Sequence, residues 1–122
     1  WANLEDLKRV VTDAIESGFA THGAKSLVLC HVSHIYPTGA ALYFTIVAGI
    51  KGDQLETWAN VKAGVNDAIV AGGGTLSHHH GVGRDHAPWL AQEIGHTGMR
   101  MLRALKAELD PTGIMNPGAL VG

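Results

Sequence analysis

Residues 27–47 read LVLCHVSHIYPTGAALYFTIV, and this stretch decides the fold. Two runs rich in branched and aromatic side chains, residues 27–35 and 41–47, are typical of β-strands. The turn-forming residues Pro-Thr-Gly lie between them at 37–39. Because this connection is too short for a crossover, we expect the two strands to pair antiparallel as a hairpin.

Alternation along the two strands assigns their residues to opposite faces. One face of the second strand carries Leu42, Phe44 and Ile46, and the other carries Tyr43, Thr45 and Val47. The same rule puts His31 and His34 on opposite faces of the first strand, with Cys30 on the face of His34. The favoured interpretation of Cys30, the only cysteine of the chain, is a small core residue.

The segments on either side of the hairpin have the apolar periodicity of helices. A first helix is predicted to begin at the N-cap Asn3 and to end between Gly18 and Gly23. A second helix is predicted to begin at the N-cap Asp53 and to end at the three glycines 72–74. These glycines lack the following Lys-Ser/Thr of a phosphate-binding loop.

The C-terminal half continues with short elements. Residues 75–78 are a candidate for a short strand, and Pro88 suits the first turn of a helix that reaches about Ile94. After the glycines 95 and 98, a last helix is predicted to end at Leu109. The order α-β-β-α-β-α-α predicts an α+β fold with a small, mostly antiparallel sheet and helices packed on one face.

Composition limits the class of protein. The chain has 122 residues, of which 46% are hydrophobic and 16% charged, and its formal net charge is −2. This length is about one domain, and the charge gives no electrostatic reason to expect nucleic acid as a partner. The single cysteine excludes an internal disulfide. The sequence has no apolar run long enough to span a bilayer.

The segment HHHGVGR at residues 78–84 is the strongest candidate site. Imidazoles titrate near neutral pH, so the three histidines are suited to moving protons. The two glycines remove side chains where a ligand could approach the backbone, and the arginine adds a cation suited to an anionic group. The candidate residues are His78, His79, His80, Gly81, Gly83 and Arg84.

These side chains also have other interpretations. A metal site is disfavoured, because neighbours on an extended segment point to opposite sides, so at most His78 and His80 share a face. The HExxH spacing is also absent, and we expect no metal. A polar turn with hydrogen-bonded imidazoles stays open. Tyr43 is either half-buried packing or a proton donor with convergent partners.

Four stretches resemble the alkyldihydroxyacetonephosphate synthases, flavoproteins of the vanillyl-alcohol oxidase type. Residues 73–83, GGTLSHHHGVG, resemble the histidine motif of that family, and residues 30–44 resemble its tyrosine-bearing hairpin. Trp89-Leu90 follows the histidines at the family's spacing. Residues 105–118, LKAELDPTGIMNPG, resemble the C-terminal signature of FAD-linked oxidases generally. The resemblance covers essentially the whole chain.

This resemblance implies FAD as the cofactor and a redox-neutral reaction of ether-lipid synthesis. The acyl group of acyl-dihydroxyacetone phosphate is exchanged for a long-chain alcohol, with the flavin as nucleophile. The resemblance implies that the catalytic residues are Tyr43, His78, His79 and His80. It implies that Arg84 and His31 bind the substrate and its phosphate. It also implies that Asn116, Gly81 and Gly83 lie at the cofactor.

Two alternative functions stay open. Lactate and glycolate dehydrogenases of the same superfamily usually carry Gly-Glu-His-Gly at this place, so only His80 would match their histidine. Oxidation of such a 2-hydroxy acid is the first alternative. The second is a non-enzymatic α+β module in which the histidines are a polar surface.

The resemblance also implies an organisation for residues 1–122, as the C-terminal part of a longer FAD-linked oxidase. Residues 1–74 are expected to be cap strands and helices, 75–86 the histidine loop, and 87–122 the C-terminal helices and a flavin-facing tail. The implied partners are an N-terminal FAD-binding domain, the lipid substrate and the alcohol. Peripheral membrane contact and a homodimer stay open. The implied location is cytoplasmic or membrane-associated in a bacterium and peroxisomal in a eukaryote.

Overall fold

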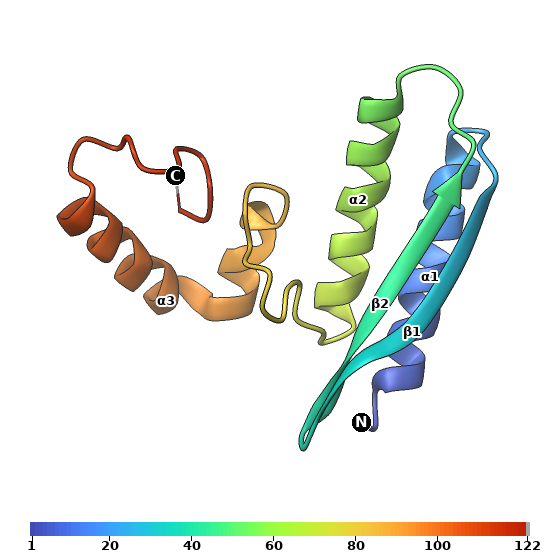
Figure 1. The fold of residues 1–122 in the computed structure, drawn as a ribbon, viewed down its shortest axis with the longest axis horizontal. Coiled ribbons are helices and arrows are strands. Elements are labelled where there is room, and N and C mark those ends of the chain that lie inside the picture. The colour runs from blue at the N-terminus through green and yellow to red at the C-terminus, as the bar shows by residue number, and fades with distance from the viewer. Residues whose placement is uncertain (122) are drawn as a thin grey trace. The chain divides into compact units, whose positions relative to one another are not determined.

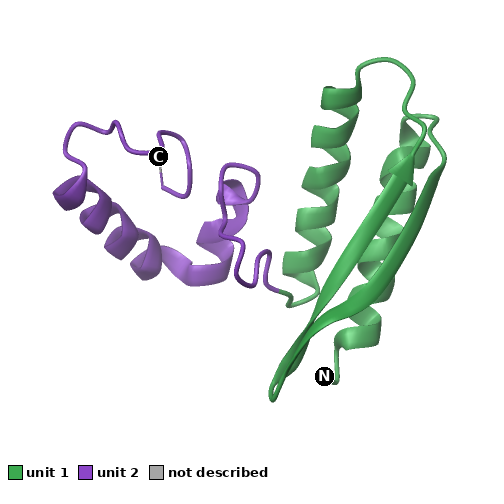
Figure 2. Ribbon diagram, viewed as in Figure 1, with its two compact units in different colours: residues 1–74 green, residues 75–122 purple. Residues whose placement is uncertain are grey.

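The computed structural model describes residues 1–121 and holds five helices and strands in that range. They are α1 (Leu4–Thr21), β1 (Ser26–Tyr36), β2 (Gly39–Ala48), α2 (Gln54–Ala71) and α3 (Ala87–Leu109) (Figure 1). The chain divides into two compact units, residues 1–74 and 75–122, which Figure 2 colours separately. The predicted α+β class with a small antiparallel sheet is confirmed.

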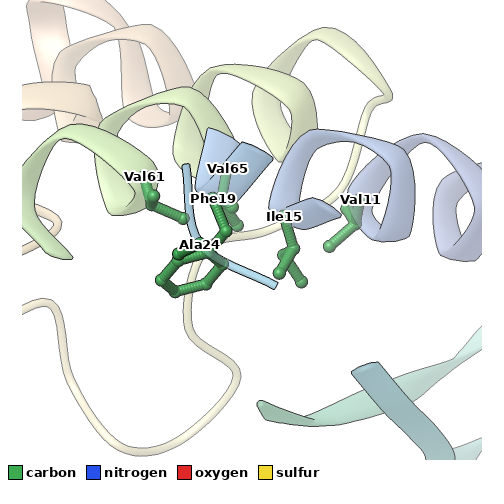
Figure 3. Packing of buried hydrophobic residues seen from close by; sticks show 6 residues of the cluster. All are labelled: Val11, Ile15, Phe19, Ala24, Val61 and Val65. Atoms are coloured by element: carbon green, nitrogen blue, oxygen red, sulfur yellow. The ribbon is translucent and has the colours of Figure 1, made fainter. Parts of the chain in front are cut away.

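In the first unit, β1 and β2 form the predicted hairpin, and α1 packs against both strands and against α2. A spacing of four residues puts Val11, Ile15 and Phe19 on one face of α1, where all three are fully buried. Figure 3 shows them converging with the other residues of the core. The core cluster consists of Val11, Ile15, Phe19, Ala24, Val61 and Val65.

A β-bulge changes the face assignment within β1. His31 pairs with Tyr43 before the bulge and His34 pairs with Ala41 after it, so Ser33 is the extra residue. Paired residues of neighbouring strands share a face, and Ala41 and Tyr43 share a face because they are two residues apart. The prediction that His31 and His34 lie on opposite faces is therefore wrong, because the bulge turns His34 to the side of Tyr43.

The two faces of the hairpin are covered differently. The inner face packs towards α1 and includes Cys30, as predicted, although His34 does not share that face. Cys30 is half-buried, and burial raises the pKa of its thiol, as expected for a core residue. The outer face, exposed except at Ala41, comprises Leu27, Leu29, His31, His34, Tyr36, Ala41, Tyr43, Thr45 and Val47.

The predicted helix caps have different outcomes. The Asp53 side chain accepts hydrogen bonds from the N–H groups of Leu55 at 3.0 Å and Glu56 at 2.9 Å, which confirms this cap of α2. Asn3 occupies the N-cap position of α1, but its side chain does not cap the helix. Its amide instead donates a hydrogen bond to the carbonyl of Gly72, and so joins the start of α1 to the end of α2.

The glycines that end α2 also allow its close approach to α1. A Cβ atom on Gly72 would lie 2.8 Å from Cδ1 of Leu7 and 3.1 Å from the carbonyl oxygen of Ala68. A Cβ atom on Gly74 would lie 2.9 Å from Cδ2 of the same leucine. The two distances to Leu7 are shorter than a carbon–carbon contact allows, so a side chain at either position would force Leu7 to move and would tighten the packing. The run 72–74 is thus structural.

Substitution of two glycines in this region should have opposite effects on stability. Gly72→Ala should lower the free energy of unfolding by about 1–3 kcal/mol, because the new methyl group overpacks the contact with Leu7. Gly64→Ala should raise it by about 0.5–1 kcal/mol, because Gly64 is exposed in mid-helix with open space around its Cα. Urea unfolding of the two variants measures both changes. Equal destabilisation by the two would contradict the packing account.

The second unit begins with an irregular loop, residues 75–86. The predicted short strand at 75–78 is wrong, because these residues bond to a side chain of α3 and not to a sheet. The two predicted C-terminal helices are the halves of α3, which is kinked at Gly95. The φ of 72° and ψ of 173° at Gly95 are a backbone conformation that is essentially restricted to glycine. None of the described helices has both the length and the apolar character that a membrane span requires.

Candidate functional site

In the first unit, the structure brings together two predicted site residues, Tyr43 and His31. They pair across the strands on the outer face, and their ring centroids are 5.2 Å apart with an angle of 31° between the planes. The Tyr43 side chain is 51% exposed, on the face turned away from α1. A phenol in contact with an imidazole on an open face can exchange a proton with a bound molecule. This geometry favours the proton-donor interpretation of Tyr43.

In the second unit, the three loop histidines form one cluster. The ring centroid of His78 lies 3.9 Å from that of His79 and 5.1 Å from that of His80, and the latter two are 4.4 Å apart. The prediction that at most two of them share a side is wrong, because residues 75–86 are not extended. All three side chains are exposed. The loop therefore gathers three titratable groups at one place on the surface of its unit.

Gly81 and Gly83 continue the loop with left-handed backbone conformations. Their φ angles are 82° and 60°, a region that glycine adopts without strain. Nothing lies within 4 Å of where a Cβ atom would stand at either position. The backbone next to the histidine cluster is therefore bare and open to a ligand, as predicted from the glycine pattern. Contact of these glycines with a cofactor stays a prediction.

The entry of the histidine loop is held by Glu93, a residue of α3. Its carboxylate accepts a hydrogen bond from the hydroxyl of Thr75 and a second, 3.4 Å long, from the N–H of Leu76. The Leu76 side chain is buried, which adds an apolar anchor to the polar one. Sequence reasoning missed Glu93, because a loop and a helix that are joined by one carboxylate leave no periodic signal.

The exit of the same loop is tied to the C-terminal tail, residues 110–121. Nη2 of Arg84 donates a hydrogen bond of 2.7 Å to the carbonyl of Pro117. The N–H of Leu120 donates one of 2.9 Å to the carbonyl of Gly83. Arg84 thus has a structural contact that the sequence did not predict. Because a guanidinium carries five N–H donors, this contact is compatible with the predicted binding of a substrate anion.

The base of the tail is organised by Asp110, which is buried. Its carboxylate accepts hydrogen bonds from the N–H groups of Ile114 at 3.1 Å and Met115 at 3.0 Å, and it forms an ion pair with Lys106. The hydrogen bond from Lys106 is the main cause that lowers the pKa of Asp110, and the backbone bonds add to it. The aspartate of the C-terminal signature therefore has a physical role, which is to fold the tail back on the end of α3.

Asn116 lies in the exposed part of this tail. Its φ of 48° is left-handed, a conformation that asparagine tolerates better than most residues. Its carbonyl accepts a hydrogen bond of 3.2 Å from the N–H of Ala119. Asn116 thus forms a turn next to Pro117, which Arg84 holds. Its predicted contact with a cofactor stays a prediction.

Acid should loosen the base of the tail. A carboxylate whose folded pKa is lowered stabilises the fold above its unfolded pKa of about 3.9, and this contribution is lost as the pH falls through the lower folded value. The protection of the Ile114 and Met115 amides against hydrogen exchange, relative to the intrinsic rate at the same pH, should therefore fall below about pH 4. Asp110→Asn should accelerate their exchange about tenfold at neutral pH. Glu108→Gln, an exposed neighbour on α3, is the control. Unchanged exchange in Asp110→Asn would show that the carboxylate does not hold the tail.

The family "FAD linked oxidases, C-terminal domain" matches residues 1–120. This chain belongs to that family. It is 32% identical over 132 residues to the alkyldihydroxyacetonephosphate synthase of Trypanosoma brucei brucei, which covers 99% of this chain and 22% of that protein. It is also 35% identical over 68 residues to the glycolate oxidase subunit GlcD of Bacillus subtilis (strain 168), which covers 56% of this chain and 14% of that one.

A solved structure agrees with these relatives. An alkyldihydroxyacetonephosphate synthase superposes with a TM-score of 0.59 at 27% sequence identity, over 96% of this chain and 18% of the other. The chain thus spans about a fifth of the length of the synthases that it matches. Resemblance to the synthases is confirmed over the whole chain.

The FAD linked oxidase family implies use of FAD, and the histidine loop fits contact with part of that cofactor. It presents clustered imidazoles and, at Gly81 and Gly83, bare backbone with open space around it. These features suit the flat reactive ring of a flavin.

Proposed function

We propose that this chain forms the substrate-facing part of an FAD-dependent enzyme that exchanges the acyl group of acyl-dihydroxyacetone phosphate for a long-chain alcohol. The observation that carries the proposal is the cluster of His78, His79 and His80 in a loop fixed at both ends. The similarity of this chain to proteins named alkyldihydroxyacetonephosphate synthase supports the proposal.

The exchange requires proton movements at two places, the reacting carbon of the substrate and the hydroxyl of the alcohol. Bound FAD would supply the nucleophile of this redox-neutral reaction. The phenolic oxygen of Tyr43 takes the proton of the substrate carbon as its own proton passes to the neighbouring His31 imidazole, and both protons return when the carbon is reprotonated. The imidazole nitrogens of the histidine cluster accept the proton of the alcohol. No base from another part of the protein is needed for that step.

Binding and positioning are assigned to other residues. Substrate binding is assigned to His31 in the first unit and to Arg84 in the second, because imidazole and guanidinium N–H groups donate hydrogen bonds to anionic oxygens. Glu93 holds the entry of the histidine loop and Arg84 its exit, so the imidazoles keep a defined place relative to the tail. Fixed geometry of this kind is a large part of enzymatic rate enhancement. An FAD-binding domain is the proposed partner for this chain.

Oxidation of a 2-hydroxy acid is the second candidate. It is favoured by the similarity of 56% of this chain to a glycolate oxidase subunit. In that reaction one imidazole is enough as the base, which leaves two members of the histidine cluster without a role. The run His78-His79-His80 resembles the histidine motif expected of the synthases, whereas only His80 would match the dehydrogenases, and this favours the exchange reaction.

Product analysis on the full-length parent protein with FAD separates the two functions. The protein is incubated with acyl-dihydroxyacetone phosphate and a labelled long-chain alcohol. The proposal predicts one labelled ether for each fatty acid released, without consumption of an electron acceptor. Consumption of an acceptor with lactate or glycolate, and no ether, would instead establish the dehydrogenase.

A further inference from the structure

The bulge in β1 places a second imidazole beside the pair of Tyr43 and His31. In a regular strand, residues three apart point to opposite faces. With the extra residue Ser33, His34 pairs with Ala41, and His31 pairs with Tyr43 two residues further along β2. The two histidines therefore occupy neighbouring positions on the outer face, about 7 Å apart along the strand.

Local contacts orient the ring of His34. Nδ1 of His34 lies 3.2 Å from the hydroxyl oxygen of Ser33, and that hydroxyl donates a hydrogen bond of 3.4 Å to the carbonyl of Ala41. The ring also stacks on Tyr36, with centroids 6.4 Å apart and an angle of 11° between the planes. With Nδ1 held close to the strand, Nε2 is the ring nitrogen that points away from it.

The charge pattern of the hairpin selects an anionic ligand. Residues 26–48 contain no aspartate or glutamate, so no carboxylate of the hairpin competes with an anion for the two imidazoles. Further along, the outer face becomes apolar, with Leu27, Leu29 and Val47 each more than half exposed. A face with imidazoles at one end and aliphatic side chains at the other matches a molecule with an anionic head and an alkyl chain.

We infer that His34 is a further substrate-binding residue, which seats the phosphate of the substrate together with His31. The inference rests on the proposed function for the identity of the substrate, whereas the phosphate seat rests on the hairpin alone. His34 donates through Nε2 to a phosphate oxygen, and His31 donates to a second one from the neighbouring position. The bulge residue Ser33 is what makes this two-point contact geometrically available.

Binding of inorganic phosphate to the full-length parent with FAD tests the inference directly. His34→Gln should weaken phosphate binding, measured by calorimetry, about tenfold, because a charge-assisted hydrogen bond is lost. It should raise KM for acyl-dihydroxyacetone phosphate by a similar factor and leave kcat within about twofold. His34→Arg should restore both values. The matched control is His22→Gln, at the exposed C-cap of α1.

Unchanged phosphate affinity in His34→Gln, with a normal flavin spectrum, would overturn the seat, and so would a lower kcat at constant KM. Comparison of dihydroxyacetone phosphate with dihydroxyacetone shows whether the seat serves the substrate headgroup or free phosphate only. A parent that binds phosphate through His34 but forms no ether would refute the proposed function and keep the seat.

Chemical modification of the protein without substitutions tests the inference even if the variants do not fold. Diethyl pyrocarbonate acylates accessible imidazoles, and mass spectrometry locates the modified residues. Inorganic phosphate should protect His31 and His34 together and leave His22 reactive. Protection of His31 alone would contradict the two-point seat.

Discussion

Replacing His78, His79 and His80 together with alanine should lower the rate of acyl exchange about 10³-fold, while the parent protein keeps its flavin absorbance. The three rings have centroids within 5.1 Å of one another, so they act on the same reactant. Proton transfer by a positioned side chain contributes two to four orders of magnitude to a rate, and no other base is assigned to the alcohol. The measurement is kcat for fatty-acid release by the full-length parent with FAD.

The control for this triple variant is His96→Ala, an exposed histidine on α3. It removes an imidazole from the same unit outside the loop, and activity should be unchanged. Single variants of the three histidines should each lose less than the triple variant, because the neighbouring rings are close enough to substitute in part. Full activity of the triple variant would establish the alternative in which the histidines are only a polar surface.

Tyr43→Phe should lower kcat for the exchange about 10²-fold with little change in KM. The substitution keeps the ring and its contact with His31 and removes only the phenolic oxygen that is proposed to move the proton. Because half of the Tyr43 side chain is exposed on the outer face, its packing contribution is small and the protein should keep its stability. Steady-state kinetics and thermal unfolding of the full-length parent measure the two effects separately.

Thr45→Val provides the matched control on the same strand. It removes a hydroxyl at the next outer-face position of β2, two residues after Tyr43, and nearly preserves the side-chain volume. It should leave kcat unchanged. If Tyr43→Phe also retained normal kcat, Tyr43 would be a packing residue, which is the other interpretation of a strand tyrosine. Loss of kcat in both variants would point to a general effect on the hairpin.

The parts of the fold that follow from short-range signals could be predicted. Alternation in residues 27–47 and the turn at 37–39 are enough for the antiparallel hairpin, because each strand face and the turn are encoded by neighbouring residues. The cap at Asp53 and the helix end at 72–74 were predicted for the same reason. Tyr43 and His31 lie on the predicted side, since they precede the irregularity in β1.

The parts that depend on one inserted residue or on distant contacts could not be predicted. The bulge at Ser33 reverses the face of His34, and strict alternation cannot express such an insertion. The sequence predicts an extended histidine run, because nothing nearby in it shows that Glu93 binds Thr75 and Leu76. The contact of Arg84 with Pro117 joins residues 33 apart, so the sequence showed only a cation available for an anion.

The roles proposed for Tyr43 and the histidine cluster depend on the ether-forming exchange. Its most direct test is anaerobic mixing of the full-length parent protein, loaded with FAD, with acyl-dihydroxyacetone phosphate, while flavin absorbance and released fatty acid are followed together. We expect the flavin to bleach as fatty acid is released, and a long-chain alcohol to restore the absorbance. No change with this substrate, together with bleaching by lactate or glycolate, would contradict the account and assign the protein to the 2-hydroxy acid dehydrogenases.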